Sequence, residues 1–180
     1  MKRQVSILVV LATFLFIFGG CDQTSKTTET IPEGTIPLFA TGTWQQRDGV
    51  FKIVIEPNGV VSSIIIPVGT AEVRPNQTTE MEMKDGSIST FTGGDFFADC
   101  NPITRELTVV VETREFHVRF LDNRLDGNRV DSLSGSVSDD GKVWEPNWIE
   151  IFDYGPGFPQ DENDILYPQP LVFDKITPQQ

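Results

Sequence analysis

The residues best suited to chemistry in this chain are one histidine, two cysteines and many carboxylates. His117 lies in the stretch EFHVRFL, where it alternates with Phe116 and Val118, and this alternation predicts an outward-facing place on a strand. A Ser-His-Asp site could assemble in space, but no Gly-x-Ser-x-Gly elbow is present to position its serine. We therefore predict no catalytic residue, no metal site and no cofactor, because the histidine and cysteine ligands that zinc prefers are too few.

Cys100 and the acidic residues carry no recognisable catalytic pattern. Cys100 lies in Asp99-Cys100-Asn101-Pro102, which favours a small residue beside a turn, and no general base is near it in the sequence. Two carboxylates could hydrolyse a glycosidic bond, but no pair of acids falls in a recognisable motif. The sequence therefore favours a non-enzymatic protein.

The amino-terminal residues place Cys21 in a distinctive setting. Two basic residues open the chain, an uncharged run follows over Val5–Phe18, and two glycines stand directly before Cys21. A basic head, an apolar stretch and small residues at a cleavage site are typical of an export signal. The run is shorter than the about 20 apolar residues that a permanent helical span requires.

This end resembles the lipobox of bacterial lipoproteins, although Phe18 stands where that family favours leucine. The resemblance implies that the signal is cut between Gly20 and Cys21, that Cys21 carries diacylglycerol, and that an acyl chain such as palmitate modifies the new amino group. One fatty chain binds membranes only marginally, whereas two or three hold firmly. We therefore predict a protein anchored on the exported side of the cell membrane or outer membrane. In the best-known sorting system, an aspartate directly after the lipidated cysteine, the position of Asp22, weakly favours retention in the inner membrane.

Charge narrows the range of partners. The formal net charge is −12, and loss of residues 1–20 would remove Lys2 and Arg3 and bring it to −14. Nucleic-acid binding requires clustered lysine and arginine, so DNA and RNA are excluded as partners. After lipidation of Cys21, Cys100 would be the remaining cysteine, and no disulfide within the chain could form.

Composition divides the chain into four parts. Residues 1–20 are the predicted signal, and residues 21–37, rich in threonine and serine, form a predicted flexible tether after the lipidated cysteine. Residues 38–153 form one predicted β-domain. Residues 154–180 form a proline-rich tail, in which Leu171-Val172-Phe173 is apolar enough to dock as a short edge strand.

The predicted β-domain favours strands over helices. Valine, isoleucine, threonine and phenylalanine dominate, and no window shows a convincing helical repeat. We predict an all-β fold, an antiparallel meander of about 8–10 strands that closes as a small lipocalin-like barrel or as a sandwich. In the last strand, Ile149 and Ile151 share one face and oppose Trp148, Glu150 and Phe152, so the strand is apolar on both faces and is predicted to be covered by the tail. The predicted turns are Asp48-Gly49, Pro57-Asn58-Gly59, Asp85-Gly86, Asn101-Pro102, Asp126-Gly127 and Asp139-Asp140-Gly141.

Three tryptophans are candidates for a core or a ligand surface. Gly42-Thr43-Trp44 resembles the Gly-x-Trp of the first lipocalin strand, and this resemblance implies that Trp44 plugs the closed end of a barrel. Trp144 and Trp148, near the last predicted strand, could close a core or line a binding surface.

Two functions remain open, with an envelope hydrolase as a distant third. The leading hypothesis is a tethered β-domain that binds a protein or polymer partner. The alternative is a carrier that holds a small apolar ligand inside the barrel. The content of the interior separates them, because a small barrel can be filled by side chains or can hold one ligand.

Overall fold

The computed structural model describes residues 36–67, 70–83, 85–120, 123–153 and 168–176. The chain divides into two compact units, residues 1–30 and 31–180, and every described residue belongs to the second. The predicted signal, Gly20, Cys21 and almost all of the tether lie outside the described residues. Within the described ranges, no helix is long and apolar enough to cross a membrane.

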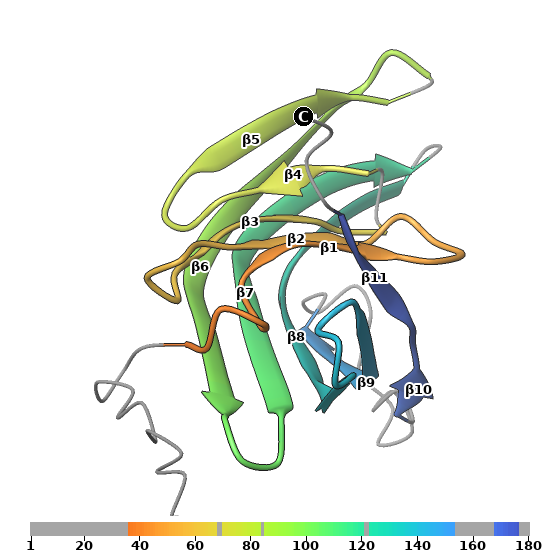
Figure 1. Cartoon of the computed structure of the whole chain (residues 1–180). Coiled ribbons are helices and arrows are strands. Elements are labelled where there is room, and N and C mark those ends of the chain that lie inside the picture. Colours follow the sequence, from red (N-terminus) through yellow and green to blue (C-terminus); the bar gives the residue numbers. More distant parts are fainter. Residues whose placement is uncertain (1–35, 68–69, 84, 121–122, 154–167, 177–180) are drawn as a thin grey trace, which may run out of the picture. The chain divides into compact units, whose positions relative to one another are not determined.

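The described residues form one antiparallel sheet that nearly closes into a barrel (Figure 1), which confirms the all-β prediction. The sheet order is β4-β3-β2-β1-β11-β9-β8-β7-β6-β5, with β10 paired to β9. Strands that follow each other in the sequence are neighbours from β1 to β4 and from β5 to β9, whereas β4 and β5 lie at the two ends of the order and β11 lies between β1 and β9. The strands are β1 (Gly42–Gln46), β2 (Lys52–Ile55), β3 (Val61–Ile65), β4 (Glu72–Val73), β5 (Thr78–Glu82), β6 (Ile88–Asn101), β7 (Glu106–Phe120), β8 (Asn123–Val137), β9 (Val143–Asp153), β10 (Gln169–Pro170) and β11 (Phe173–Ile176).

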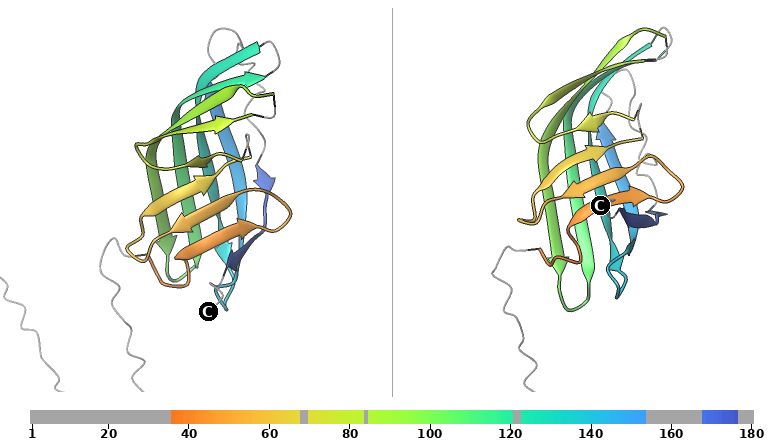
Figure 2. Two further views of the ribbon diagram at one scale, coloured as in Figure 1. Left: turned by 90° about the horizontal axis from the view of Figure 1, so that it is seen from above. Right: turned by 45° about the horizontal axis from the view of Figure 1, so that its top comes forward.

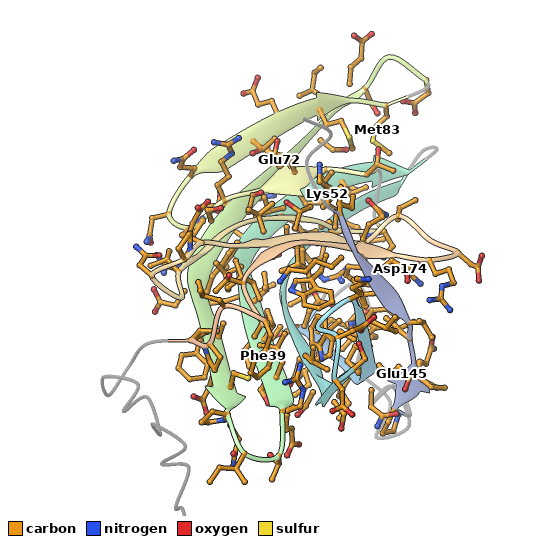
Figure 3. The ribbon with its side chains drawn as sticks, in the orientation of Figure 1. Phe39, Lys52, Glu72, Met83, Glu145 and Asp174 are labelled. Atoms are coloured by element: carbon orange, nitrogen blue, oxygen red, sulfur yellow. The ribbon has the colours of Figure 1, made fainter. Side chains whose placement is uncertain are left out.

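Strand β11 joins the two ends of the meander. It pairs with β1 on one side, where Trp44 lies opposite Lys175, and with β9 on the other, where Trp144 lies opposite Phe173. The carboxyl-terminal segment therefore has a neighbour on each side, whereas the sequence predicted an edge position. An exposed ion pair between Arg47 and Asp174, 2.6 Å long, also ties β11 to the loop after β1 (Asp174 is labelled in Figure 3).

The short strands β1–β4 cross the long strands β6–β9, as both views of Figure 2 show. On the far side from β11, the segment between β4 and β5 approaches β6 at Gly93. Gly93 donates to the carbonyl of Gln77 at 3.0 Å, and its own carbonyl accepts from Asn76 at 3.1 Å. A Cβ atom at Gly93 would lie 2.1 Å from the carbonyl oxygen of Arg74, so this close approach requires glycine.

The core follows the period of two that strands impose. In β7, Leu107, Val109 and Val111 are fully buried on the inner face, as the alternation in the sequence predicts. The other fully buried apolar side chains come from both groups of strands and face the same interior. They include Ile53, Ile55, Val61, Ile64, Ile66, Val73 and Leu133.

Two predictions about local structure are wrong. Asp126-Gly127 is not a hairpin turn, because both residues lie within β8, where Asp126 faces His117 and Gly127 faces Phe116. The described part of the tail does not cover Ile151, which is 58% exposed. That part, β10 and β11, instead pairs with β9 along its edge.

Candidate functional site

A continuous series of aromatic rings runs through the interior of the barrel. Trp44 contacts Trp144 edge-on at 6.0 Å between ring centroids, and Trp144 contacts Phe173 at 5.1 Å. Phe173 lies 6.4 Å from Phe51, which meets Trp148 edge-on at 5.2 Å. These five rings, here called the aromatic column, come from β1, β9, β11 and the residue before β2. Each such pair adds roughly 0.5–1.5 kcal/mol beyond the area that it buries.

The Trp44 end of the aromatic column is sealed by polar contacts. The Trp44 indole N–H donates to the carbonyl of Ala40 at 2.9 Å. Lys175 lies above the Trp44 ring, with Nζ 5.3 Å from its centroid, and donates to the carbonyls of Leu38 and Phe39. Burial lowers the pKa of Lys175. Trp44 is fully buried here.

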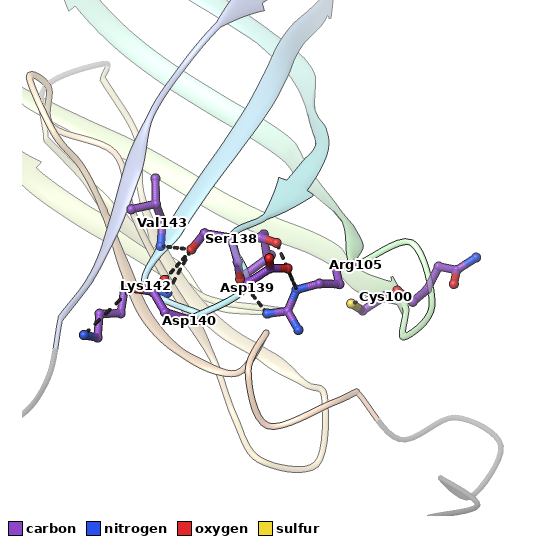
Figure 4. Close-up of polar contacts among 9 residues, drawn as sticks. Cys100, Arg105, Ser138, Asp139, Asp140, Lys142 and Val143 are labelled. Carbon is purple, nitrogen blue, oxygen red and sulfur yellow. Dashed lines mark hydrogen bonds and ion pairs between the residues drawn. The ribbon is translucent and has the colours of Figure 1, made fainter. Parts of the chain in front are cut away.

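Arg105 contacts Phe39, whose carbonyl also accepts from Lys175, and Figure 4 shows Arg105 beside Ser138 and Asp139. Its guanidinium lies 3.8 Å from the centroid of the Phe39 ring and donates to the carbonyls of Val137 and Ser138. Phe39 is labelled in Figure 3. Cys100 lies nearby, and burial raises the pKa of its thiol to about 11. Because the thiolate is the nucleophilic form, this cysteine is a poor nucleophile at neutral pH.

The other end of the aromatic column meets buried charges. Arg129 donates from Nε and one Nη to the two carboxylate oxygens of Asp131, at 2.9 and 2.6 Å. Its other Nη lies 3.0 Å from Oε1 of Glu150. The Trp148 indole N–H donates to Asp131 at 2.8 Å. These groups, here called the internal polar cluster, are buried, with Asp131 0%, Arg129 3% and Glu150 7% exposed.

Strand register brings the internal polar cluster together. Asp131 on β8 lies directly opposite Glu150 on β9, so both carboxylates project from the same face. Arg129 is two residues from Asp131 along β8, and alternate residues of a strand share a face. Leu133, the next inward residue, lies opposite Trp148. The cluster is thus a continuation of the apolar inner face.

Two buried hydroxyl groups on the inner face have no hydrogen-bond partner among the described residues. They are Thr113 Oγ1 and Ser89 Oγ, and both residues are fully buried. Thr113 is the cross-strand neighbour of Arg129, which places its side chain beside the internal polar cluster. Buried polar groups nearly always have a partner, so an unpaired hydroxyl at this point is unusual.

The carboxyl group of Glu150 differs electrostatically from an exposed one. Burial raises its pKa above the usual 4.5, the nearby Arg129 opposes that rise, and the charge of Asp131 adds to it. A carboxyl whose pKa is perturbed by burial and by specific charged neighbours is typical of functional sites. The cluster holds one guanidinium against two carboxyls, so it carries excess negative charge whenever Glu150 is ionised.

A second charged group lies on the outer face, around His117. Nδ1 of His117 is 2.5 Å from Asp126, and Nε2 is 3.0 Å from Glu115. Arg124 donates to Asp126 at 2.7 Å, and this bond, followed by the one to His117, lowers the pKa of Asp126. His117 therefore faces outward, as predicted, and pairs with two exposed carboxylates. Within the described residues, no cluster of three or more potential ligands is arranged to hold a metal ion.

The outer face of the long strands also carries exposed apolar side chains. Phe97 on β6 is 57% exposed and Ile151 on β9 is 58% exposed. Between them, Val110 on β7 lies opposite Phe97, and Val130 on β8 lies opposite Ile151. These four side chains share the face away from the internal polar cluster and are here called the apolar band, although Ser132 lies opposite Val110 and Glu112 lies opposite Val130.

Sequence reasoning located the tryptophans but missed the charges beside them. Trp44 and Trp144 are fully buried and Trp148 is half-buried, all three in the aromatic column. Arg129, Asp131 and Glu150 gave no motif. The sequence signal for these three residues was that they occupy inward-facing strand positions, whose neighbours on the same face are otherwise apolar. No protein-family model, curated protein or solved structure matches the chain.

Proposed function

We propose that this protein is a membrane-tethered barrel that binds a small ligand on its inner face, at the internal polar cluster. The observation that carries the proposal is a buried guanidinium shared by two carboxyls, next to the unpartnered hydroxyl of Thr113. The tether is the lipidated Cys21 that the sequence predicts. Binding of a protein or polymer partner also stays a prediction from the sequence, and the apolar band at Phe97 and Ile151 is the surface that would serve it.

Energetics support a binding role for the internal polar cluster. Moving charged groups into the interior costs several kcal/mol per ion after relaxation, and replacing such a pair by well-packed apolar residues is often neutral or stabilising. Stability alone is therefore a poor reason for Arg129, Asp131 and Glu150 to be buried. A ligand-binding role explains their burial, because a few convergent polar groups on an apolar wall fix the orientation of a small molecule.

The two ends of the aromatic column differ in polarity, and each end suits a different part of a ligand. The Trp44 end of the aromatic column is filled by Trp44, Trp144 and Phe173 and sealed by Lys175. The Trp148 end carries the polar groups. A ligand with an apolar body and a polar head matches this division, with the head at the cluster.

The proposal is tested with the exported full-length chain, purified in a nonionic detergent. Three eight-carbon probes, octylamine, 1-octanol and octanoate, are titrated while tryptophan fluorescence is recorded. Because the Trp148 indole bonds to Asp131, a probe at the cluster should change the Trp148 emission. The change should disappear in Trp148→Phe and persist in Trp44→Phe, whose substituted ring lies at the sealed end. If none of the three probes gives a signal that depends on Trp148, the proposed function is wrong.

A further inference from the structure

We infer that the internal polar cluster selects a ligand with a protonated amine on an apolar chain and discriminates against a carboxylate. This inference rests on the proposed function and names the ligand class for the same site. Four features of the described residues carry it: the charge count of the cluster, the commitment of Arg129, the unpaired hydroxyls and the apolar surroundings.

The charge count favours a cation. One guanidinium, that of Arg129, faces the carboxyl groups of Asp131 and Glu150 within the buried set. An ammonium group would supply the second positive charge that balances the second carboxylate. A buried charge is tolerated when it is paired and hydrogen-bonded, so the amine and Glu150 would each offset the desolvation of the other.

The contacts of Arg129 disfavour an anion. All three guanidinium nitrogens contact carboxylate oxygens, two of them on Asp131 and one on Glu150. A ligand carboxylate at Arg129 would lie beside the carboxyl groups of Asp131 and Glu150. Three carboxyls around one guanidinium would repel one another in the interior, where an uncompensated negative charge is strongly unfavourable.

The unpaired hydroxyls match the donors of an ammonium group. A primary ammonium has three N–H donors and no acceptor, whereas a hydroxyl or carboxylate oxygen accepts. Among the described residues, Thr113 Oγ1 has no hydrogen-bond partner and stands next to Arg129, and Ser89 Oγ is a second unpaired acceptor on the inner face. An amine at the cluster can therefore donate to Glu150 and to Thr113, and binding would satisfy a buried hydroxyl that no described residue satisfies.

The surroundings supply the apolar half of the site. Val111 on β7 lies opposite Asp131, and Leu133 is the next inward residue along β8. Both side chains are fully buried, and the ring of Trp148 lies on the adjacent strand. An alkyl chain extending from the amine would contact these side chains and the face of an indole ring, which also attracts cations.

The test is a ranking of the three matched probes. Affinities of octylamine, 1-octanol and octanoate for the exported full-length chain are measured at neutral pH by titration calorimetry, in the same nonionic detergent. One charge-assisted hydrogen bond gained by the amine corresponds to a preference of about tenfold or more over octanoate. Equal or tighter binding of octanoate would overturn the inference while leaving the proposed function intact.

Two variants separate the cluster from general attraction to an acidic protein. Glu150→Gln keeps the shape of the side chain and should weaken octylamine about tenfold while 1-octanol changes by less than about threefold. Glu115→Gln removes an exposed carboxylate on the outer face and should leave octylamine binding unchanged. An unchanged octylamine affinity in Glu150→Gln would contradict the inference. If that variant does not fold, the ranking in the wild type decides alone.

Discussion

At the scale of single residues, Glu150 gives a prediction about pH. Its pKa is raised in the folded protein above the usual 4.5, chiefly by burial, so the native state holds the proton more tightly than the unfolded chain. The stability that this proton contributes is complete below the unfolded pKa and is lost as the pH rises through the native pKa. Arg129 and Asp131 are the charged groups facing Glu150 and are counted in that shift.

Glu150→Gln should therefore flatten the pH dependence of stability, because glutamine imitates the neutral carboxyl at every pH. The free energy of unfolding of the wild type, minus that of the variant, should fall as the pH rises from about 4 to about 8. Urea denaturation across this range measures it. A difference that stays constant or rises with pH would contradict the raised pKa.

Thr113→Val tests the unpaired hydroxyl. A buried hydroxyl without a partner costs roughly 1–3 kcal/mol, and valine has nearly the same shape, so the ligand-free variant should be more stable by about 1 kcal/mol. Thr108→Val on the same strand is the matched control, because Thr108 pairs with Ser134 at 2.8 Å and its loss should destabilise the protein. Denaturant midpoints report both changes. Destabilisation of Thr113→Val would show that its hydroxyl already has a partner.

The sequence predicted the positions of some of these residues and missed others. Trp44 and the outward-facing His117 follow from a short motif and from alternation, because both signals are local. Arg129, Asp131 and Glu150 could not be predicted as a site, because they meet only through the register of β8 and β9. Residues that are polar on an inner face look, in the sequence alone, like residues of an outer face.

At the scale of elements, β11 makes the strongest prediction. Phe173 is fully buried between Trp144 and Phe51 in the aromatic column. Phe173→Ala should lower the free energy of unfolding by about 3–5 kcal/mol, the usual cost of removing a buried phenylalanine ring. Asp174→Ala, which breaks the exposed pair with Arg47, should have a small effect. Calorimetric unfolding separates the two. Equal, small effects would mean that β11 is not part of the folded core.

Strand positions were predictable where alternation was clear, as in β2, β7 and β9. Strand β8 was not, because Arg129 and Asp131 occupy its inner face and its sequence contains Asp126-Gly127, a typical turn pair. Here the glycine sits opposite Phe116, and the aspartate pairs with His117 and Arg124 across and along the strands. Tertiary pairing thus outweighs the local turn preference.

At the scale of the whole molecule, the predicted lipid anchor determines where the protein acts, and it can be tested by labelling. Cells that express the chain and are fed a labelled fatty acid should label the wild type and Cys100→Ser but not Cys21→Ser. Cys100→Ser is the matched control, because Cys100 is buried in the β-domain. Gel fluorescence measures the label. Equal labelling of all three proteins would exclude lipidation at Cys21, while the inner-face site would remain to be tested separately.

The position of β11 has a consequence for when the barrel can close. The first strand of the sheet pairs with the last, more than a hundred residues away along the sequence, as Thr43 opposite Ile176 illustrates. Long-range pairing of this kind is slow, because the ends must find each other before any contact repays the lost chain entropy. β11 is synthesised after every other described strand. The described barrel therefore stays open until β11 has been made, and an unclosed chain is what the predicted export through a translocation channel would require.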